Sequence, residues 1–193
     1  MSLSYSDTSD ISTNFKNEIK RSLKIPTSNT DHDQDLVDLA VTAITMLERA
    51  CGRLFLTRTV TWKFDEFPLE DCLEVPLPPF ISVTSIAYID TDGVEQTWDS
   101  SKYLVSTSTP GRIEPIESES WPTTKNRVDA VTITFSAGYG ATESTIPAGI
   151  RQAIKTCVKY WFEEATPEGE IPSGAMSLID GFKHGRFSQL MRA

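Results

Sequence analysis

Histidine is almost absent from this chain: its 193 residues include only His32 and His184. Neither histidine is spaced from cysteines or carboxylates in a pattern that holds a metal ion. The three cysteines, Cys51, Cys72 and Cys157, contain no C-x-x-C pair, and an odd number cannot pair completely. We therefore expect no metal, no cofactor and no disulfide framework, which is typical of a reducing compartment.

The sequence also lacks the short motifs that mark common catalytic sites. It has no G-x-S-x-G motif for a nucleophilic serine, and Gly138-Tyr139-Gly140 lacks the third glycine of a dinucleotide-binding loop. Neighbouring carboxylates such as Asp65-Glu66 occur, but a glycosidase needs two of them at a defined separation in a cleft. These acids fall in expected loops and helix ends, where a solvated surface is the simpler interpretation. We expect that the protein is not an enzyme.

Positive charge is scarce: 18 Lys and Arg stand against 27 Asp and Glu, which gives a net charge of −9. Tight binding to duplex DNA depends on neutralising phosphates with Lys and Arg, so this balance argues against it. An acidic surface is instead compatible with DNA that slides past. No run approaches the ~20 apolar residues of a membrane-spanning helix, and the polar N-terminus has no signal-peptide pattern. We expect a chain made in the cytoplasm, with no membrane partner.

Two segments have the periodicity of amphipathic helices. Apolar residues recur at spacings of three and four over 34–51, where Gly52 is placed to end the helix, and again over 147–165. A weaker stripe over 11–23 predicts a short N-terminal helix that needs a partner surface, because it is only one residue wide.

The segment between the two strong helices has the alternation and turn signals of β-strands. Asp92-Gly93 predicts a hairpin. The expected strands are 59–64, 73–77, 83–90, 94–98, 103–106, 112–116 and 131–136. The fold class is therefore α+β, with a helical core, a β-rich insertion (58–136) of antiparallel strands and polar terminal arms. The expected parts are an N-terminal arm (1–33), a main domain (34–166) and an irregular C-terminal tail (167–193).

Four stretches, in order along the chain, resemble the head–tail connector (adaptor) family of long-tailed bacteriophages. They are LERACGR with LTRT (47–59), LEVPLPPFISVTSIAY (73–88), Trp121-Pro122, and FSAGYG with IPAGIRQAI and VKYWFEE (135–164). The resemblance covers about residues 34–166 and does not extend clearly into either end.

This resemblance implies a structural protein of the virion neck, made in the host cytoplasm. Copies of such a protein form a ring, typically of twelve, below the portal protein. The ring extends the DNA channel and gives the tail or its stopper protein a docking surface, while packaged DNA passes through the lumen without specific binding.

The resemblance and the distribution of charge single out three groups of residues. In the family the C-terminal segment reaches the portal, and the residues expected to dock here are Phe182, Lys183, Arg186, Phe187 and Leu190. Residues expected at an interface are Trp121, Arg53 and Arg58. Acids expected to face the channel are Glu117 and Glu119.

Alternatives remain open at this point. A tail-completion or tail-terminator protein would bind tail tubes instead of the portal. A carbohydrate-acting enzyme or binding module would need paired acids in a cleft, and a soluble α+β domain of another role is also compatible with the pattern. The sequence does not determine the number of copies in a ring, the tail type or the face that lines a channel.

Overall fold

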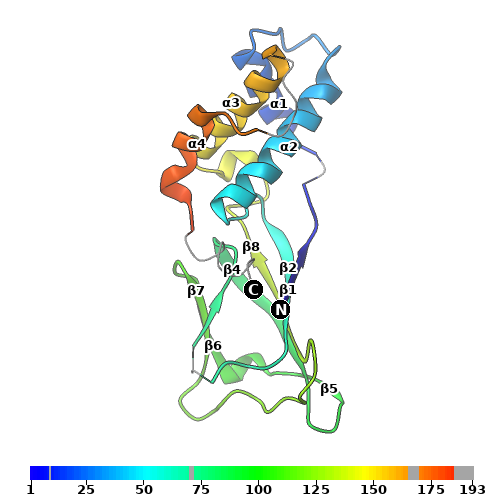
Figure 1. Ribbon diagram of the computed structural model, residues 1–193, viewed down its shortest axis with the longest axis vertical. Helices are drawn as coiled ribbons and strands as arrows, with labels where there is room; N and C mark the ends of the chain where they lie inside the picture. The colour runs from blue at the N-terminus through cyan, green and yellow to red at the C-terminus, as the bar shows by residue number, and fades with distance from the viewer. Residues whose placement is uncertain (9, 70–71, 165–169, 185–193) are drawn as a thin grey trace. The chain divides into compact units, whose positions relative to one another are not determined.

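The computed structural model describes residues 1–8, 10–69, 72–164 and 170–184 (Figure 1). The chain divides into two compact units, which we call the β unit (residues 1–6 and 57–138) and the helical unit (residues 7–56 and from 139 onward). Helices and antiparallel sheets are both present, which confirms the predicted α+β class. No helix within the described ranges has the length and apolar character needed to cross a membrane.

Four α-helices are found among the described residues of the helical unit. They are α1 (Thr13–Ser22), α2 (Asp33–Cys51), α3 (Ala148–Glu164) and α4 (Ser173–Ile179). Helix α3 packs against the other three, and the apolar stripes predicted for 34–51 and 147–165 form the core between them. Gly52 ends α2 in the left-handed conformation (φ 65°), as its position predicted, and its N–H donates to the carbonyl of Glu48.

The N-terminal helix obtains its partner surface inside this unit. Phe15 and Ile19 of α1 are fully buried, so the narrow stripe is covered by α2 and α3. Ser12 caps the helix by accepting from the N–H of Phe15. The N–H and hydroxyl of Ser12 in turn donate to the carboxylate of Glu143, at 3.0 and 2.6 Å. Glu143 lies in a short 3₁₀ turn (Glu143–Thr145) and is only 3% exposed.

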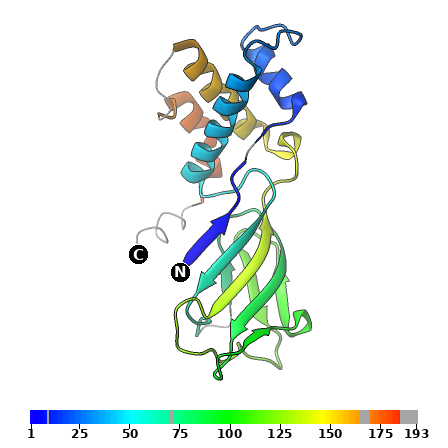
Figure 2. The same cartoon turned by 90° about the vertical axis from the view of Figure 1, so that its right-hand side faces the viewer.

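The described residues of the β unit form two antiparallel sheets (Figure 2). The first has the strand order β1 (Ser2–Tyr5), β2 (Arg58–Phe64), β8 (Val131–Ala137), β4 (Phe80–Ile89), β5 (Glu95–Thr97). The second has the order β3 (Leu73–Val75), β7 (Gly111–Pro115), β6 (Tyr103–Ser106), with a 3₁₀ turn at Ser100–Lys102. The hairpin predicted at Asp92-Gly93 joins β4 and β5.

Close packing joins the two sheets through their apolar faces. Val60, Trp62, Ile133 and Phe135 alternate inward from β2 and β8 and are buried. A side chain at Gly111 of β7 would lie 2.6 Å from the ring of Phe80 in β4, so the second sheet covers the inner face of the first at contact distance. The other face of each sheet therefore points away from the interior of the β unit.

The structure differs from the sequence-based expectation at both ends of the chain. Residues 2–5, expected in a polar arm, form β1 and pair with β2, where Leu3 lies opposite Trp62. The expectation of irregular structure after residue 167 is wrong for Ser173–Ile179, which form α4. Ala175 and Ile179 of α4 are fully buried against the helical core, and this long-range packing outweighs the local preference of Gly174 and Pro172 for loops.

Candidate functional site

Cys51, Cys157 and His32 have side chains of types that often take part in catalysis, but here they make structural contacts. Burial raises the pKa of Cys51 to about 11 and the pKa of Cys157 to about 12, so both thiols stay protonated at neutral pH. His32 contacts Asp35 and the edge of the Phe162 ring. Within the described residues, no group of three or more His, Cys, Asp and Glu side chains is arranged to hold a metal ion.

The turn after α2 fixes the start of the C-terminal segment. Nε of Arg53 donates to the carbonyl oxygen of Phe182 at 2.5 Å, and the N–H of His184 donates to the carbonyl of Cys51 at 2.8 Å. Arg53 also lies beside Tyr139, where burial raises the pKa of the phenol and the guanidinium opposes that shift. Arg53, expected at an interface, is thus half-buried in a contact that holds the end of the described chain in place.

The residues expected to dock on the portal fall on both sides of the limit of the described chain. Phe182 lies against α3, where a side chain at Gly149 would be 3.2 Å from its ring, and Lys183 pairs with Asp180 at 2.7 Å. The other three, Arg186, Phe187 and Leu190, lie outside the described residues. Their docking role remains a prediction.

Arg58 is the first residue of β2, and only 8% of it is exposed. Its guanidinium lies over the ring of Tyr5 in β1, 5.7 Å from the ring centroid. This cation–π contact ties β1 to β2 within the β unit. A direct part in an interface, as expected from the sequence, remains a prediction.

Trp121 belongs to an aromatic cluster in the β unit. Its ring is stacked on Phe67 with centroids 4.9 Å apart, and Trp98 lies 5.1 Å from it. Trp98 also contacts Tyr103 of β6. Trp121 is half-buried, and its ring contacts fasten the loop between β7 and β8, while its expected part in an interface remains a prediction.

Glu117 and Glu119 lie on the same loop, directly after β7. Glu117 is exposed, whereas Glu119 is half-buried and lies 3.4 Å from Nζ of Lys102. Their proposed position facing a channel depends on an assembly and remains a prediction.

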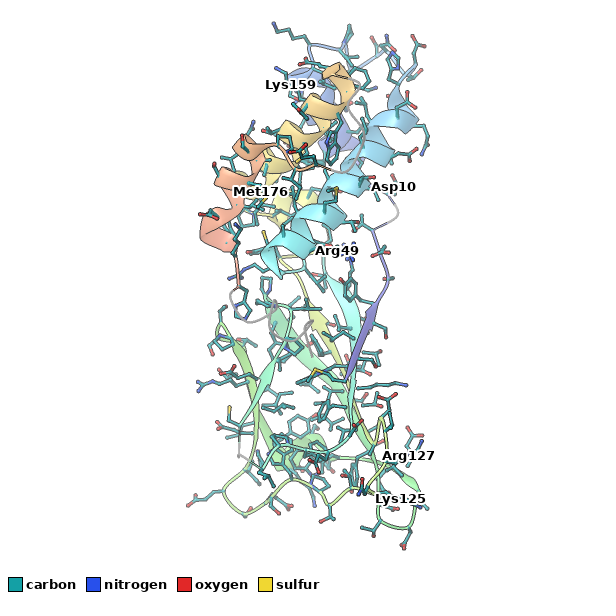
Figure 3. All side chains as sticks on the ribbon, viewed as in Figure 1. Asp10, Arg49, Lys125, Arg127, Lys159 and Met176 are labelled. Carbon is teal, nitrogen blue, oxygen red and sulfur yellow. The ribbon has the colours of Figure 1, made fainter. Side chains whose placement is uncertain are left out.

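A small polar cavity at the end of β2 and β4 was not foreseen from the sequence. Its volume is about 190 Å³, and its lining includes Lys63, Tyr88, Glu95, Arg127 and Thr132. Figure 3 shows that Arg127 and Lys125 come from the loop that precedes β8. Acidic and basic groups are mixed around this cavity, so it has no clear preference for a charged ligand.

The outward face of the five-stranded sheet is a second feature that sequence reasoning missed. Cross-strand partners share a face, and the register therefore places three rows of residues together. Ten of these twelve positions are serine or threonine, and we call these three rows the hydroxyl face. Its rows are Thr59, Ser136, Ser82; Ser4, Thr61, Thr134, Ser85; and Ser2, Lys63, Thr132, Ala87, Thr97. The next row on the same side pairs Ile89 with Glu95, which places one carboxylate at the edge of this face.

Comparison with solved structures finds likenesses along nearly the whole chain. A chain from the neck of the empty gene transfer agent (GTA) particle, computed with C6 symmetry, superposes with a TM-score of 0.77 at 22% identity, covering 96% of this chain and 97% of that one. A chain from the virion of the native GTA particle gives 0.77 at 21%, covering 96% and 97%. A chain from the neck of the native GTA particle, computed with C12 symmetry, gives 0.72 at 21%, covering 95% and 96%.

This chain shares their fold. No protein-family model matches the chain, and neither does any curated protein. The identities of 21–22% limit the likeness to the fold, so a role in assembly has to be argued from the surfaces described above.

Proposed function

We propose that this chain is a structural virion protein, the head–tail connector (adaptor) of a phage-like particle. The observation that carries the proposal is the likeness in fold, over 96% of the chain, to a protein in the neck of the GTA particle. Coverage of 96% means that the likeness extends over both units and beyond the region of sequence resemblance at 34–166. Copies form a ring below the portal, and the C12 symmetry of one similar neck supports twelve copies.

The distribution of charge supports a channel through which DNA passes without being held. Between residues 57 and 138 there are thirteen Asp and Glu against six Lys and Arg, so the β unit carries most of the net charge of −9. Backbone phosphates are repelled by such a surface, and specific binding would need clustered cations. An acidic lumen therefore keeps the passage non-adhesive.

The geometry around Arg53 supports a docking role for the C-terminal segment. Two hydrogen bonds, from Arg53 to Phe182 and from His184 to Cys51, hold the last described residues beside the end of α2. Residues 185–193 then carry Arg186, Phe187, Leu190 and Arg192 with no acid, a composition suited to an apolar and acidic groove on a partner. The portal protein is the proposed partner.

Co-assembly tests this function. The purified chain is mixed with the portal protein encoded beside it, and electron microscopy is used to look for a symmetric collar of added mass. We expect the full chain to form a collar and a chain lacking residues 185–193 to lose it. Lys159→Ala, on α3 in the helical unit, serves as the matched control and should leave the collar intact (Figure 3).

The outcomes separate the alternatives. A collar that survives the deletion keeps the connector role and moves the docking site away from the C-terminal segment. If the chain does not bind an intact portal but does bind tail tubes, the connector role is overturned in favour of a tail-completion or tail-terminator protein.

A further inference from the structure

The hydroxyl face is an open surface of the β unit whose chemistry is unlike that of the rest of the unit. In Figure 2 its strands β2, β8 and β4 lie in front of the strands of the three-stranded sheet. All twelve side chains are half-buried or exposed, and Lys63 is its one charged residue. Of the thirteen acids between residues 57 and 138, Glu95 lies at the edge of this face, where it pairs with Ile89 in the next row, and none lies within the three rows.

The outward face of the three-stranded sheet differs, because it carries charged side chains of both signs and an exposed apolar side chain. Its register places Glu74, Arg112 and Ser106 in one row and Leu104 beside Glu114 in the next. Leu104 is 57% exposed, which makes it one of the most exposed large apolar side chains of a strand in the described chain. Because the two sheets pack through their inner faces, this Leu104 face and the hydroxyl face point in opposite directions.

We propose that the hydroxyl face of one copy packs against the Leu104 face of the next copy. This interface rests on the proposed ring and names the surfaces that form it. A contact between two different faces is heterologous. Each copy uses its hydroxyl face to bind one neighbour and its Leu104 face to bind the other, so the contact repeats head to tail. Repetition of this kind closes into a ring when each copy is rotated from the last by a whole fraction of a turn about one axis, and the similar folds come from necks computed with C6 and C12 symmetry.

Electrostatics identify a second copy of this chain as the occupant. Two molecules with a charge of −9 repel each other at most orientations. The hydroxyl face reduces this repulsion because its three rows contain no carboxylate and Glu95 lies only at its edge, and Lys63 offers a positive partner to Glu114 of the neighbouring copy. Neutral hydroxyls also cost less to desolvate than charged groups, and short side chains lose little rotamer entropy on contact.

Cross-linking inside the portal-bound collar tests the interface. The background is Cys72→Ser, because Cys51 and Cys157 are buried with raised pKa values and stay unreactive. Thr134→Cys and Leu104→Cys are combined in one chain, and a short bis-maleimide reagent is added. We expect a ladder of dimers, trimers and higher multimers on a denaturing gel.

Matched variants exclude other geometries. Each single cysteine should give no multimer, and a dimer from Thr134→Cys alone would overturn the proposal by showing an isologous contact. Val94→Cys with Leu104→Cys is the control pair, because Val94 is exposed at the β4–β5 hairpin and on neither face. A collar without a ladder from the Thr134 and Leu104 pair overturns the interface and leaves the connector role standing.

Substitution at the centre of the hydroxyl face gives an independent readout. Thr134→Glu should lower occupancy of the collar at least about tenfold, because each contact would then enclose an unpaired carboxylate. Thr134→Val and Val94→Glu should keep normal occupancy, and thermal unfolding of each purified variant checks that the fold is retained. Normal occupancy of Thr134→Glu overturns the interface. A full chain that never joins the portal overturns the connector role, and with it the ring on which this interface rests.

Discussion

Glu143 shows how a single buried carboxylate joins distant parts of the helical unit. It accepts both the N–H and the hydroxyl of Ser12, 131 residues away, and is 3% exposed. We predict that Glu143→Ala lowers the free energy of unfolding by about 1–3 kcal/mol, because the N–H of Ser12 loses its acceptor. Urea unfolding measures the change, with Ser12→Ala and the double variant completing a cycle. If the losses of unfolding free energy in the two single variants add up to the loss in the double variant, the result contradicts direct coupling between Ser12 and Glu143.

Asp33 couples the stability of the helical unit to pH. Hydrogen bonds from Lys16, and then from Lys20, hold the pKa of Asp33 below its ordinary value of 3.8. A lowered folded-state pKa contributes stability above the unfolded value of about 3.9, and this contribution is lost as the pH falls through the folded value. We therefore predict that, between about pH 5 and pH 2, the free energy of unfolding of Asp33→Asn falls less steeply than that of the parent chain.

Urea unfolding across this pH range measures the effect, since urea, unlike guanidinium chloride, does not screen ion pairs. Asp31→Asn is the control, because Asp31 is exposed in the turn just before α2. If the free energy of unfolding of Asp33→Asn falls as steeply with decreasing pH as that of the parent chain, Asp33 is not the source of the pH dependence.

At the scale of the elements, local sequence predicted the helices and strands whose periodicity is strong. The helix expected at 34–51 is Asp33–Cys51, and the helix expected at 147–165 is Ala148–Glu164. The elements that were missed, β1 and α4, are short and flanked by polar residues, glycine or proline. Their stability comes from pairing with β2 and from burial of Ala175 and Ile179, which are long-range contacts that local periodicity does not encode.

The two faces of β1 offer a test of its structural role. Leu3 and Tyr5 lie on the inward side, half-buried opposite Trp62 and Val60, whereas Ser2 and Ser4 lie on the outward side. We predict that Leu3→Ser with Tyr5→Ser lowers the free energy of unfolding by about 2 kcal/mol, because apolar area returns to water. The edge of β2 should then also pair between molecules, which light scattering detects as aggregation.

The same strand supplies its own control. Ser2→Ala with Ser4→Ala changes the same number of residues on the opposite face and should alter stability by less than about 0.5 kcal/mol. Equal effects of the two double variants would mean that β1 contributes only through its backbone.

At the scale of the whole molecule, the candidate surfaces depend on register that no short stretch of sequence contains. The alternation of Thr59, Thr61 and Lys63 predicted a strand with one polar side, and so did the alternation around Thr132 and Thr134. That these polar sides form one surface follows only from the pairing of β2 with β8, some 70 residues later. The aromatic contacts of Trp121 and the link from Arg53 to Phe182 likewise join segments far apart in the sequence.

The acidic surface of the β unit gives a prediction for the assembled particle. Glu117 is the better target of the two acids expected to face the channel, because it is exposed, whereas Glu119 already pairs with Lys102. If Glu117 lines the lumen, Glu117→Lys reverses one charge in every copy of the proposed ring, and each new lysine attracts a backbone phosphate. DNA ejection from particles that carry the variant should therefore slow.

The rate of ejection at several salt concentrations separates this effect from a defect in assembly. Screening weakens attraction between lysine and phosphate, so the ejection rate of Glu117→Lys particles should approach the parent rate as salt rises. Glu117→Gln removes the charge without adding attraction and should eject at nearly the parent rate. Slow ejection that is independent of salt would indicate a misassembled ring. An unchanged rate for Glu117→Lys at low salt would place Glu117 away from the channel, because a ring of new cations in contact with passing DNA has to retard it.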